Sequence, residues 1–296
     1  MTLPVPTPMT VPDSVLPHPI PVPVALQRTF RPGEVALVGA GPGDPGLLTV
    51  AGWSLLWQAD ALVYDRLVSQ ALLDLLPTSC RRYYVGKASG RHSLPQGEIN
   101  QLLVRLARHG MRVVRLKGGD PFIFGRGGEE LDFLLKHGVD CQLVPGITAA
   151  SGCTAYAGIP LTYRGLAHSC HFITGHVQHN GKLDLPWQTL VDPGCTLVFY
   201  MGLGSLEEIS RELIAAGRAA DTPAMMVFNG TRHDQRTLRG SLRTLGDMAR
   251  HHRLATPTLT VIGQVVGMLA DRYVEHPSRI RANLQPTPSS TEPLCG

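Results

Sequence analysis

The feature that most constrains the fold of this chain is the regular alternation of short apolar runs with helical patterns. The first strand-like runs are Val35–Val38, Ala61–Tyr64, Arg82–Val85, Arg112–Leu116 and Cys141–Val144. Between the third and the fourth run, Ile99, Leu102, Leu103 and Leu106 have the i, i+3, i+4, i+7 spacing of a one-sided helix. Strands that alternate with helices in this way predict an α/β domain.

A second series of strand-like runs follows, again with helical patterns between them: "CHFITG", "TLVFYMG", "PAMMVFNG" and "TLTVIGQVV". The clearest helix of this half is "LEEISRELIAAG", which we expect to end at Gly217. A chain of 296 residues has room for two domains at roughly 100–200 residues each. We therefore expect an α/β domain at residues 33–148, a linker at 149–164 and a second α/β domain at 165–275.

Both ends of the chain are rich in proline. Residues 1–32 contain "LPVPTPMTVPDSVLPHPIPVPV", and residues 276–296 contain "QPTPSSTEPLCG". Proline at nearly every second or third position prevents regular helix and sheet hydrogen bonding. Both segments are therefore predicted to be extended, disordered tails.

Composition excludes several functional classes. The formal net charge of +4 is too small to indicate nucleic-acid binding, but it is compatible with an anionic ligand. No apolar run approaches the roughly 18 residues needed to span a membrane, and the N-terminus does not have the pattern of a signal peptide. We expect a cytoplasmic protein with neither nucleic acid nor membrane as a partner.

Cysteine and histidine spacing argues against a metal site. The six cysteines are scattered with no C-x-x-C pair, which is typical of reduced thiols in a cytoplasmic protein. The segment "HFITGHVQH" places His171, His176 and His179 close together, but their spacing matches no zinc pattern. We predict no metal.

The loop in "VALVGAGPGDPGLLT" only partly matches a dinucleotide-binding turn. Gly39 and Gly41 fit the G-x-G-x-x-G pattern, but Asp44 stands where its third glycine belongs. Pro42 and Pro45 remove N–H donors that a pyrophosphate would need, and the carboxylate adds like charge. The loop therefore favours a ligand that approaches the backbone closely but carries no phosphate, which argues against a nicotinamide oxidoreductase.

Glycine-rich polar loops follow strand after strand. In α/β sheets ligands gather at the carboxyl ends of strands, so these loops predict a shared ligand crevice, although any one of them could be an ordinary tight turn. The densest loop is "RLKGGDPFIFGRGGEE", in which Phe122, Ile123 and Phe124 lie among glycines and charged residues. An apolar wall beside bare backbone suits a flat, partly apolar ligand.

Taken together, "VGAGPGDPGLLT", "YDRLV", "YVGK", "RLKGGDPFIFGRGGEE", "PGITAASGCTAYAGIPLTYR" and "LVFYMGL" resemble the uroporphyrinogen-III C-methyltransferases of the tetrapyrrole methyltransferase family. The resemblance covers about residues 34–270. It implies two consecutive α/β domains, each a sheet flanked by helices, with the active site in the crevice between them. It also implies S-adenosylmethionine as the methyl donor and a homodimer.

The reaction that the resemblance implies is methylation of uroporphyrinogen III at C2 and C7, giving precorrin-2 through precorrin-1. That product feeds sirohaem, haem d1 or cobalamin synthesis. The segment "HVQHNGKLDLPW" is similar to stand-alone forms of the sirohaem and haem d1 branch. An alternative is a related methyltransferase that acts on a later corrin intermediate.

The resemblance also assigns roles to individual residues. The cofactor-contacting positions are Pro42, Gly118, Gly119, Asp120, Ile123, Thr148, Ala149, Met201 and Gly230. Asp65 matches the proton acceptor and Lys87 the proton donor. The tetrapyrrole carries many carboxylates, for which arginine is the natural partner. We expect Arg126, Glu129, Arg164 and Met201 to bind it, with Arg126 also taking part in catalysis.

For Arg115, a substrate contact and an ordinary salt bridge remain equally open. Tyr163 and Phe228 depart from the residue types common in the family and leave local substrate contacts open. The rival functions from other classes are methylation of RNA or protein and a non-enzymatic scaffold. A methyltransferase that acts on RNA or protein would require a more strongly basic face than a net charge of +4 indicates. A non-enzymatic scaffold gives no reason for glycine-rich loops after so many strands.

Overall fold

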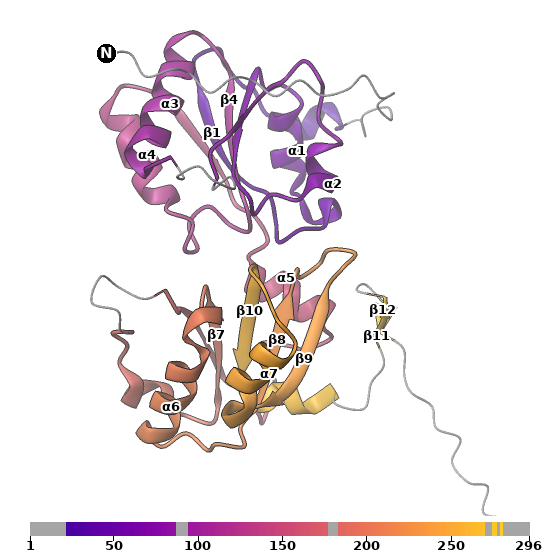
Figure 1. Ribbon diagram of the computed structural model, residues 1–296. Coiled ribbons are helices and arrows are strands. Elements are labelled where there is room, and N and C mark those ends of the chain that lie inside the picture. Colours follow the sequence, from indigo (N-terminus) through magenta and orange to yellow (C-terminus); the bar gives the residue numbers. More distant parts are fainter. Residues whose placement is uncertain (1–21, 87–93, 177–182, 270–273, 277–278, 281–296) are drawn as a thin grey trace, which may run out of the picture.

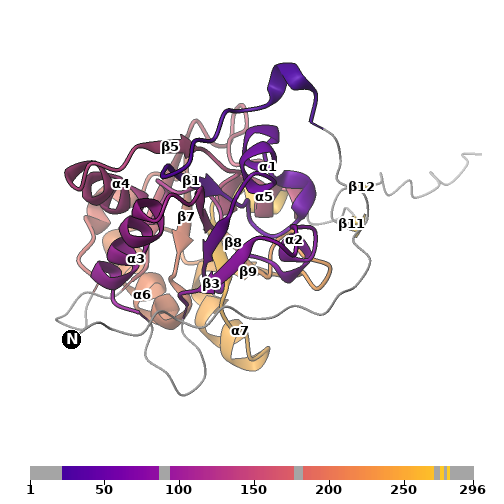
Figure 2. The same cartoon turned by 90° about the horizontal axis from the view of Figure 1, so that it is seen from above.

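The computed structural model describes residues 22–86, 94–176, 183–269, 274–276 and 279–280. Two sheet units follow one another along the chain (Figure 1). The same arrangement seen at a right angle shows the first unit lying over the second (Figure 2). The expected α/β architecture of two sheets with flanking helices is confirmed.

The first sheet is parallel throughout, in the order β3-β2-β4-β1-β5. Its strands are β1 Val35–Gly39, β2 Ala61–Tyr64, β3 Arg81–Tyr84, β4 Val113–Lys117 and β5 Cys141–Val144. Every residue of β1, β2 and β4 is buried. A parallel strand that helices cover on both faces must be apolar along its length, which explains the continuous runs seen in the sequence.

Helices cover both faces of this sheet. They are α1 Val50–Leu56, α2 Gln70–Leu73, α3 Gln96–Arg108 and α4 Gly127–Lys136, with short 3-10 turns at Val24–Leu26 and Pro45–Leu47. Leu55 of α1 and Leu72 of α2 belong to the core on one face. Leu103 of α3 and Leu134 of α4 belong to the core on the other face.

The second sheet is mixed, in the order β6-β7-β10-β8-β9. Its strands are β6 Ser169–Thr174, β7 Cys195–Tyr200, β8 Pro223–Phe228, β9 Arg236–Ser241 and β10 Thr258–Ile262. β6 runs parallel to β7, and both β7 and β8 run antiparallel to β10. The carboxyl ends of β6, β7 and β8 therefore share one edge of the sheet.

Three helices sandwich the second sheet. They are α5 Ala149–Tyr156, α6 Leu206–Ala216 and α7 Leu245–His251. Ala150 and Cys153 of α5 pack with Val198 and Met225 on one face, while α6, α7 and a 3-10 turn at Trp187–Leu190 cover the other. Further 3-10 turns are Leu203–Ser205, Leu242–Thr244 and Gln264–Leu269, and β11 Val274–His276 pairs with β12 Arg279–Ile280. Gly217 ends α6 in a left-handed conformation, as the sequence indicated.

Two parts of the chain differ from the sequence expectation. The first half of the predicted linker, 149–164, is helix α5, whose apolar face lies in the core of the second unit. The last part of the predicted tail, 1–32, packs on the first unit: Phe30 is only 5% exposed, and the Arg28 amide donates to Ser54 Oγ at 3.0 Å. The exact domain boundaries stay a prediction.

Candidate functional site at the junction of the two sheets

The loops after β1, β4 and β5 contact one another through the backbone atoms of their glycines. A Cβ atom on Gly39 would lie 2.5 Å from the Cα of Gly146, so neither position has room for a side chain. Gly41 and Gly119 exchange two backbone hydrogen bonds, of 3.2 and 2.8 Å, and both have a φ of +70°. Glycine is needed at both because this conformation is strained for other residues. The glycines thus let the three loops pack directly against one another, while the close approach of a ligand to this backbone stays a prediction.

Helix α5 starts directly beside these loops and brings the predicted cofactor positions together. A Cβ on Gly119 would lie 3.8 Å from the Ala149 amide nitrogen, and Pro42 packs against Gly152 in the next turn of the helix. Gly230, in the loop after β8, packs against Cys153 of the same helix. Residues from both sheet units thus surround the first two turns of α5, which lies at the junction in Figure 1.

Asp120 holds the shape of the longest loop. Its carboxylate accepts hydrogen bonds from the amides of Phe122, at 2.8 Å, and Gly146, at 3.0 Å. The second of these bonds ties the loop after β4 to the loop after β5. Ile123 donates its amide to the Asp120 carbonyl at 3.4 Å, which places Ile123 in the same turn.

Asp44 explains why the first loop departs from the dinucleotide pattern. Its carboxylate accepts from the Gly46 amide at 2.7 Å and from the Tyr156 hydroxyl at 2.6 Å, while its own amide donates to Thr231 Oγ1 at 3.0 Å. Burial, and then the bond to this carboxylate, raise the pKa of Tyr156 to about 12. Asp44 therefore fastens the first loop to α5 and to the loop after β8. The sequence alone indicates that Asp44 is unsuited to binding phosphate, but it does not indicate these contacts.

Asp65 lies at the carboxyl end of β2 above a buried group of charges. Its carboxylate accepts from the Leu67 amide at 3.0 Å and from Arg115 Nη2 at 3.1 Å. Its side chain is 26% exposed, whereas that of Arg115 is 4% exposed. Arg115 also donates to Glu130 Oε1 at 3.2 Å, and Lys117 Nζ donates to the same oxygen at 2.9 Å.

This geometry decides between the two roles left open for Arg115. The guanidinium is buried and pairs with Asp65 and Glu130, so it belongs to a salt-bridge network and not to the exposed arginines. Burial, and then the neighbouring Arg115, lower the pKa of Lys117. Arg115 therefore holds the Asp65 carboxylate in place through their ion pair.

Arg126 and Glu129 form an exposed bidentate ion pair at the start of α4. Arg126 Nη2 lies 2.6 Å from Glu129 Oε2 and its Nε lies 2.9 Å from Oε1, and both side chains are 56% exposed. The hydrogen bond from Arg126 lowers the pKa of Glu129. Arg164 is exposed in the turn between Tyr163 and Ala167, and Lys87 lies outside the described residues.

Left-handed backbone is concentrated at the same junction. The non-glycine residues with positive φ are Phe124, Arg126, Met201, Asn229, Thr231 and Arg253, among the residues that the structure describes. All but Arg253 lie in the loops after β4, β7 and β8. Such conformations cost free energy and are concentrated at functional sites, where the surrounding structure holds them in place.

Exposed apolar side chains accompany the strained backbone. Phe122 is 49% exposed, Met201 is 52% exposed, and Leu67, Phe124 and Ile147 are exposed as well. All five lie in loops after β2, β4, β5 and β7. Large apolar side chains left in water around bare backbone are typical of a binding site for a partly apolar ligand.

The expected lack of a metal site is not contradicted: within the described ranges, no three His, Cys, Asp or Glu side chains are grouped so that they could hold an ion. Nor does any helix in those ranges have the length and hydropathy to cross a membrane.

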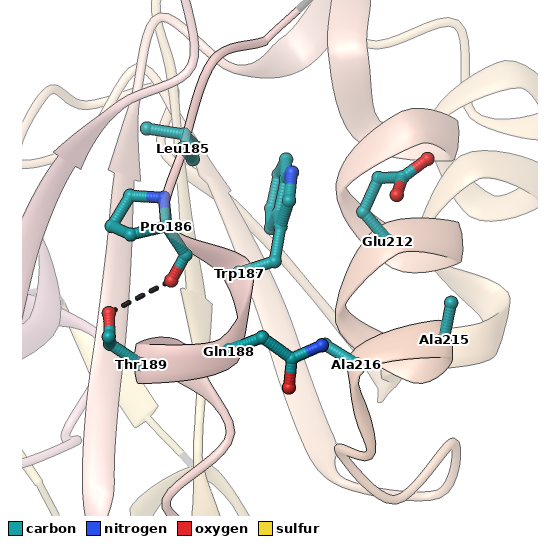
Figure 3. Close-up of a pocket in the computed structure, with 8 residues that line it drawn as sticks. All are labelled: Leu185, Pro186, Trp187, Gln188, Thr189, Glu212, Ala215 and Ala216. Atoms are coloured by element: carbon teal, nitrogen blue, oxygen red, sulfur yellow. Dashed lines mark hydrogen bonds between the residues drawn. The ribbon is translucent and has the colours of Figure 1, made fainter.

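Two surface depressions of about 400 Å³ are lined by residues other than the predicted site residues. One is lined by Trp187 and Gln188 of the 3-10 turn before β7 and by Glu212 near the end of α6 (Figure 3). It lies toward the amino end of β7, opposite the glycine loops, and Glu212 in it pairs with Arg211 at 2.9 Å. The other lies along α5 and includes Thr154 and Ile159. Neither gathers catalytic side chains, so the loop junction remains the candidate site.

Comparisons with known proteins agree with this geometry. The family model for tetrapyrrole (corrin/porphyrin) methylases matches residues 34–246. The siroheme synthase of Pseudomonas fluorescens strain SBW25 is 58% identical over 237 residues, and that of Pseudomonas aeruginosa strain LESB58 is 56% identical over 234 residues. These matches cover 80% and 79% of this chain but 51% and 50% of the relatives, so the chain spans about half of their length.

Solved structures of tetrapyrrole methyltransferases are also similar to this chain. The uroporphyrin-III C-methyltransferase of Thermus thermophilus is 39% identical, with a TM-score of 0.68 over 80% of this chain and 95% of its own. A Thermus thermophilus uroporphyrin-III C-methyltransferase in complex with S-adenosyl homocysteine is 40% identical, with a TM-score of 0.67 over 79% of this chain and 93% of its own. Cobalt precorrin-4 methyltransferase is 28% identical, with a TM-score of 0.70 over 79% and 96%. The chain therefore belongs to the tetrapyrrole (corrin/porphyrin) methylase family.

Proposed function

We propose that this chain transfers methyl groups from S-adenosylmethionine to C2 and C7 of uroporphyrinogen III, giving precorrin-2 through precorrin-1. The observation that carries the proposal is the convergence of bare glycine backbone from three loops on the start of α5, together with exposed apolar side chains in the loops after β2, β4, β5 and β7. The similarity to two siroheme synthases and to the Thermus uroporphyrin-III C-methyltransferase supports the choice of substrate.

The residues at the junction fit S-adenosylmethionine. A Cβ on Gly119 would meet no atom closer than 3.8 Å, so a ligand can approach its backbone, and Asp44 and two prolines take the place of phosphate-binding donors. The residues that would hold the cofactor are Pro42, Gly118, Gly119, Asp120, Ile123, Thr148, Ala149, Met201 and Gly230. When bound, S-adenosylmethionine supplies an electrophilic methyl group on a sulfonium centre.

The protein's task is then to orient the tetrapyrrole and to remove a proton. Arg126 and Arg164 bind carboxylates of the substrate, Glu129 accepts from a pyrrole N–H, and Met201 contacts the ring. When a ring carbon gains the methyl group, the ring becomes cationic and must lose a proton to restore its neutral form. Asp65 accepts that proton, because its carboxylate is partly exposed and Arg115 holds it in place. Lys87 is assigned as a proton donor by the family resemblance alone, and the methyl transfer and proton loss described above do not require it.

The test is an anaerobic assay of the purified chain with uroporphyrinogen III and S-adenosylmethionine. We expect a product that has gained two methyl groups by mass spectrometry, together with S-adenosylhomocysteine. A chain that binds S-adenosylhomocysteine but leaves uroporphyrinogen III unmethylated would contradict the proposal.

The alternative is methylation of a later corrin intermediate. Its support is the similarity to cobalt precorrin-4 methyltransferase, whose TM-score of 0.70 is close to the 0.68 of the uroporphyrin enzyme. The sequence identity of 28% is lower than 39%, which favours uroporphyrinogen III. Offering both substrates in one reaction distinguishes the two functions, because only the true substrate is consumed at a catalytic rate.

We also propose that the enzyme acts as a homodimer in the cytoplasm and that its product feeds sirohaem, haem d1 or cobalamin synthesis. The five cysteines within the described ranges are free, which fits a reducing compartment.

A further inference from the structure

Tyr200, the last residue of β7, makes an unusual contact with the start of α5. Its hydroxyl accepts a hydrogen bond from the Ala150 amide at 3.0 Å and lies 2.6 Å from Thr148 Oγ1. Thr148 occupies the N-cap position of α5, yet its side chain makes no capping hydrogen bond. Threonine at this position normally accepts from an amide of the first helical turn. Here a tyrosine from the second sheet accepts that bond.

Because Tyr200 accepts the amide hydrogen bond in place of Thr148, one hydroxyl hydrogen of this pair is not needed to cap the helix. Burial raises the pKa of Tyr200, so the phenol keeps its hydrogen at neutral pH. Tyr200 and Thr148 share one hydrogen bond, in which either can be the donor. Each hydroxyl has one hydrogen, so the pair has one donor left for a ligand beside Thr148 and Ala149.

The ring of Tyr200 reaches the other half of the junction. Its centroid lies 5.0 Å from that of Phe124, at an angle of 55°, and 5.9 Å from that of Phe172, at 57°. Tilted aromatic pairs at such distances are favourable. Phe124 has a left-handed backbone and lies two residues before Arg126, which also has one. The ring therefore supports the loop that carries Arg126.

We propose that Tyr200 is a positioning residue with two separable contributions. Its hydroxyl keeps Thr148 and the start of α5 in the form that binds the adenosyl cofactor. Its ring keeps Phe124 and the Arg126 loop in the form that binds the tetrapyrrole. The identity of both ligands rests on the proposed function, whereas the division between hydroxyl and ring rests on the contacts of Tyr200.

The test compares Tyr200→Phe, which removes only the hydroxyl, with Tyr200→Leu, which also removes the ring. Binding of S-adenosylhomocysteine is measured by calorimetry, and KM is measured for each substrate. For Tyr200→Phe we expect S-adenosylhomocysteine to bind about tenfold more weakly, the equivalent of about 1.4 kcal/mol, with the KM for uroporphyrinogen III within about twofold of the parent. For Tyr200→Leu we expect the KM for uroporphyrinogen III to rise by about tenfold as well.

A double-mutant cycle with Thr148→Val shows whether the two hydroxyls act together. We expect the combined loss of S-adenosylhomocysteine affinity to be smaller than the sum of the single losses, because both changes break one network. Normal binding by Tyr200→Phe, or additive losses, would overturn the positioning role. A parent protein that binds S-adenosylhomocysteine but does not methylate uroporphyrinogen III would instead overturn the proposed substrate. A parent that does not bind it would overturn both.

Discussion

Two adjacent glutamates of α4 show how burial decides what a carboxylate does. Glu129 is 56% exposed and pairs with the exposed Arg126. Glu130 is fully buried and accepts from Arg115 and Lys117 through one oxygen, while its Oε2 has no hydrogen-bond partner among the described residues. The exposed Glu129 carboxylate can exchange Arg126 for a ligand. The buried Glu130 carboxylate instead pairs with two buried cations, Arg115 and Lys117.

We predict that Glu130→Gln lowers the free energy of unfolding by roughly 3–5 kcal/mol, because buried Lys117 loses the carboxylate it pairs with and Arg115 keeps only Asp65. The matched control is Glu129→Gln, which we expect to change stability by no more than about 1 kcal/mol because its ion pair is exposed. Urea denaturation at neutral pH measures both. Equal losses would show that the Glu130 network contributes no more than a surface pair.

Two Arg–Asp pairs link the segments of β2 and β4, and only the pair at the carboxyl end of β2 lies at the proposed site. Asp65 pairs with Arg115 at the carboxyl end, and Asp60 pairs with Arg112 at 2.8 Å at the amino end. We predict that Asp65→Asn lowers kcat by about 100-fold or more, the usual effect of removing a general base. Its affinity for S-adenosylhomocysteine should stay unchanged.

Asp60→Asn is the control for that substitution, and it should keep its activity. The hydrogen bond from Arg112 holds the pKa of Asp60 below its ordinary value. The pair therefore stabilises the fold above about pH 4 and loses this effect as the pH falls through the lowered pKa. We expect the stability of Asp60→Asn to depend less on pH in the acid range. Loss of turnover in Asp60→Asn but not in Asp65→Asn would contradict the assignment.

Among the helices and strands, the sequence predicted those whose buried apolar residues form a continuous run or recur with a helical period. The strands of the first sheet were predicted to within a residue at each end, and three of them, β1, β2 and β4, are unbroken buried runs. β9 was not predicted, since none of its residues is buried and "RTLRGS" contains no apolar run. The sequence predicts a linker at α5 because its small residues give no amphipathic pattern, whereas in the structure its inner face is core.

The candidate site was predictable only in part for the same reason. The glycines of the loops can be recognised in the sequence because bare backbone requires them. The partners of Asp44, Asp65 and Tyr200 come from distant segments, and no local pattern indicates such contacts.

The N-terminal segment yields a prediction about where the fold begins. Deleting residues 1–21 should leave the melting temperature unchanged, because this proline-rich sequence has no means of building a core. Phe30→Ala should lower stability by roughly 3–5 kcal/mol, since the ring is buried against the first sheet. Thermal and urea unfolding of both variants check this. A deletion that lowers the melting temperature by several degrees would show that the first residues dock on the fold.

At the scale of the whole molecule, we predict a homodimer in which the exposed side of α5 takes part. Sedimentation at micromolar concentration should give about twice the chain mass of 32.0 kDa. Ala155 is exposed and lines the depression along α5, so Ala155→Arg should shift the protein toward the monomer. A parent protein that sediments as a clean monomer would refute the dimer.

The central claim is that one junction holds two ligands by different means, the cofactor on bare backbone and the tetrapyrrole on exposed arginine. Binding of S-adenosylhomocysteine by Arg126→Ala and Gly119→Val, measured by calorimetry beside turnover, tests it most directly. Arg126→Ala should bind normally but turn over at least about tenfold more slowly, because losing a charge-assisted contact costs more than about 1.4 kcal/mol. Gly119→Val should lose binding, because a branched side chain blocks the backbone and φ is +70° there.

Arg211→Ala breaks another exposed Arg–Glu pair and should leave both binding and turnover unchanged. The account is contradicted if Arg126→Ala abolishes S-adenosylhomocysteine binding in a folded protein, or if Gly119→Val binds that ligand as the parent does.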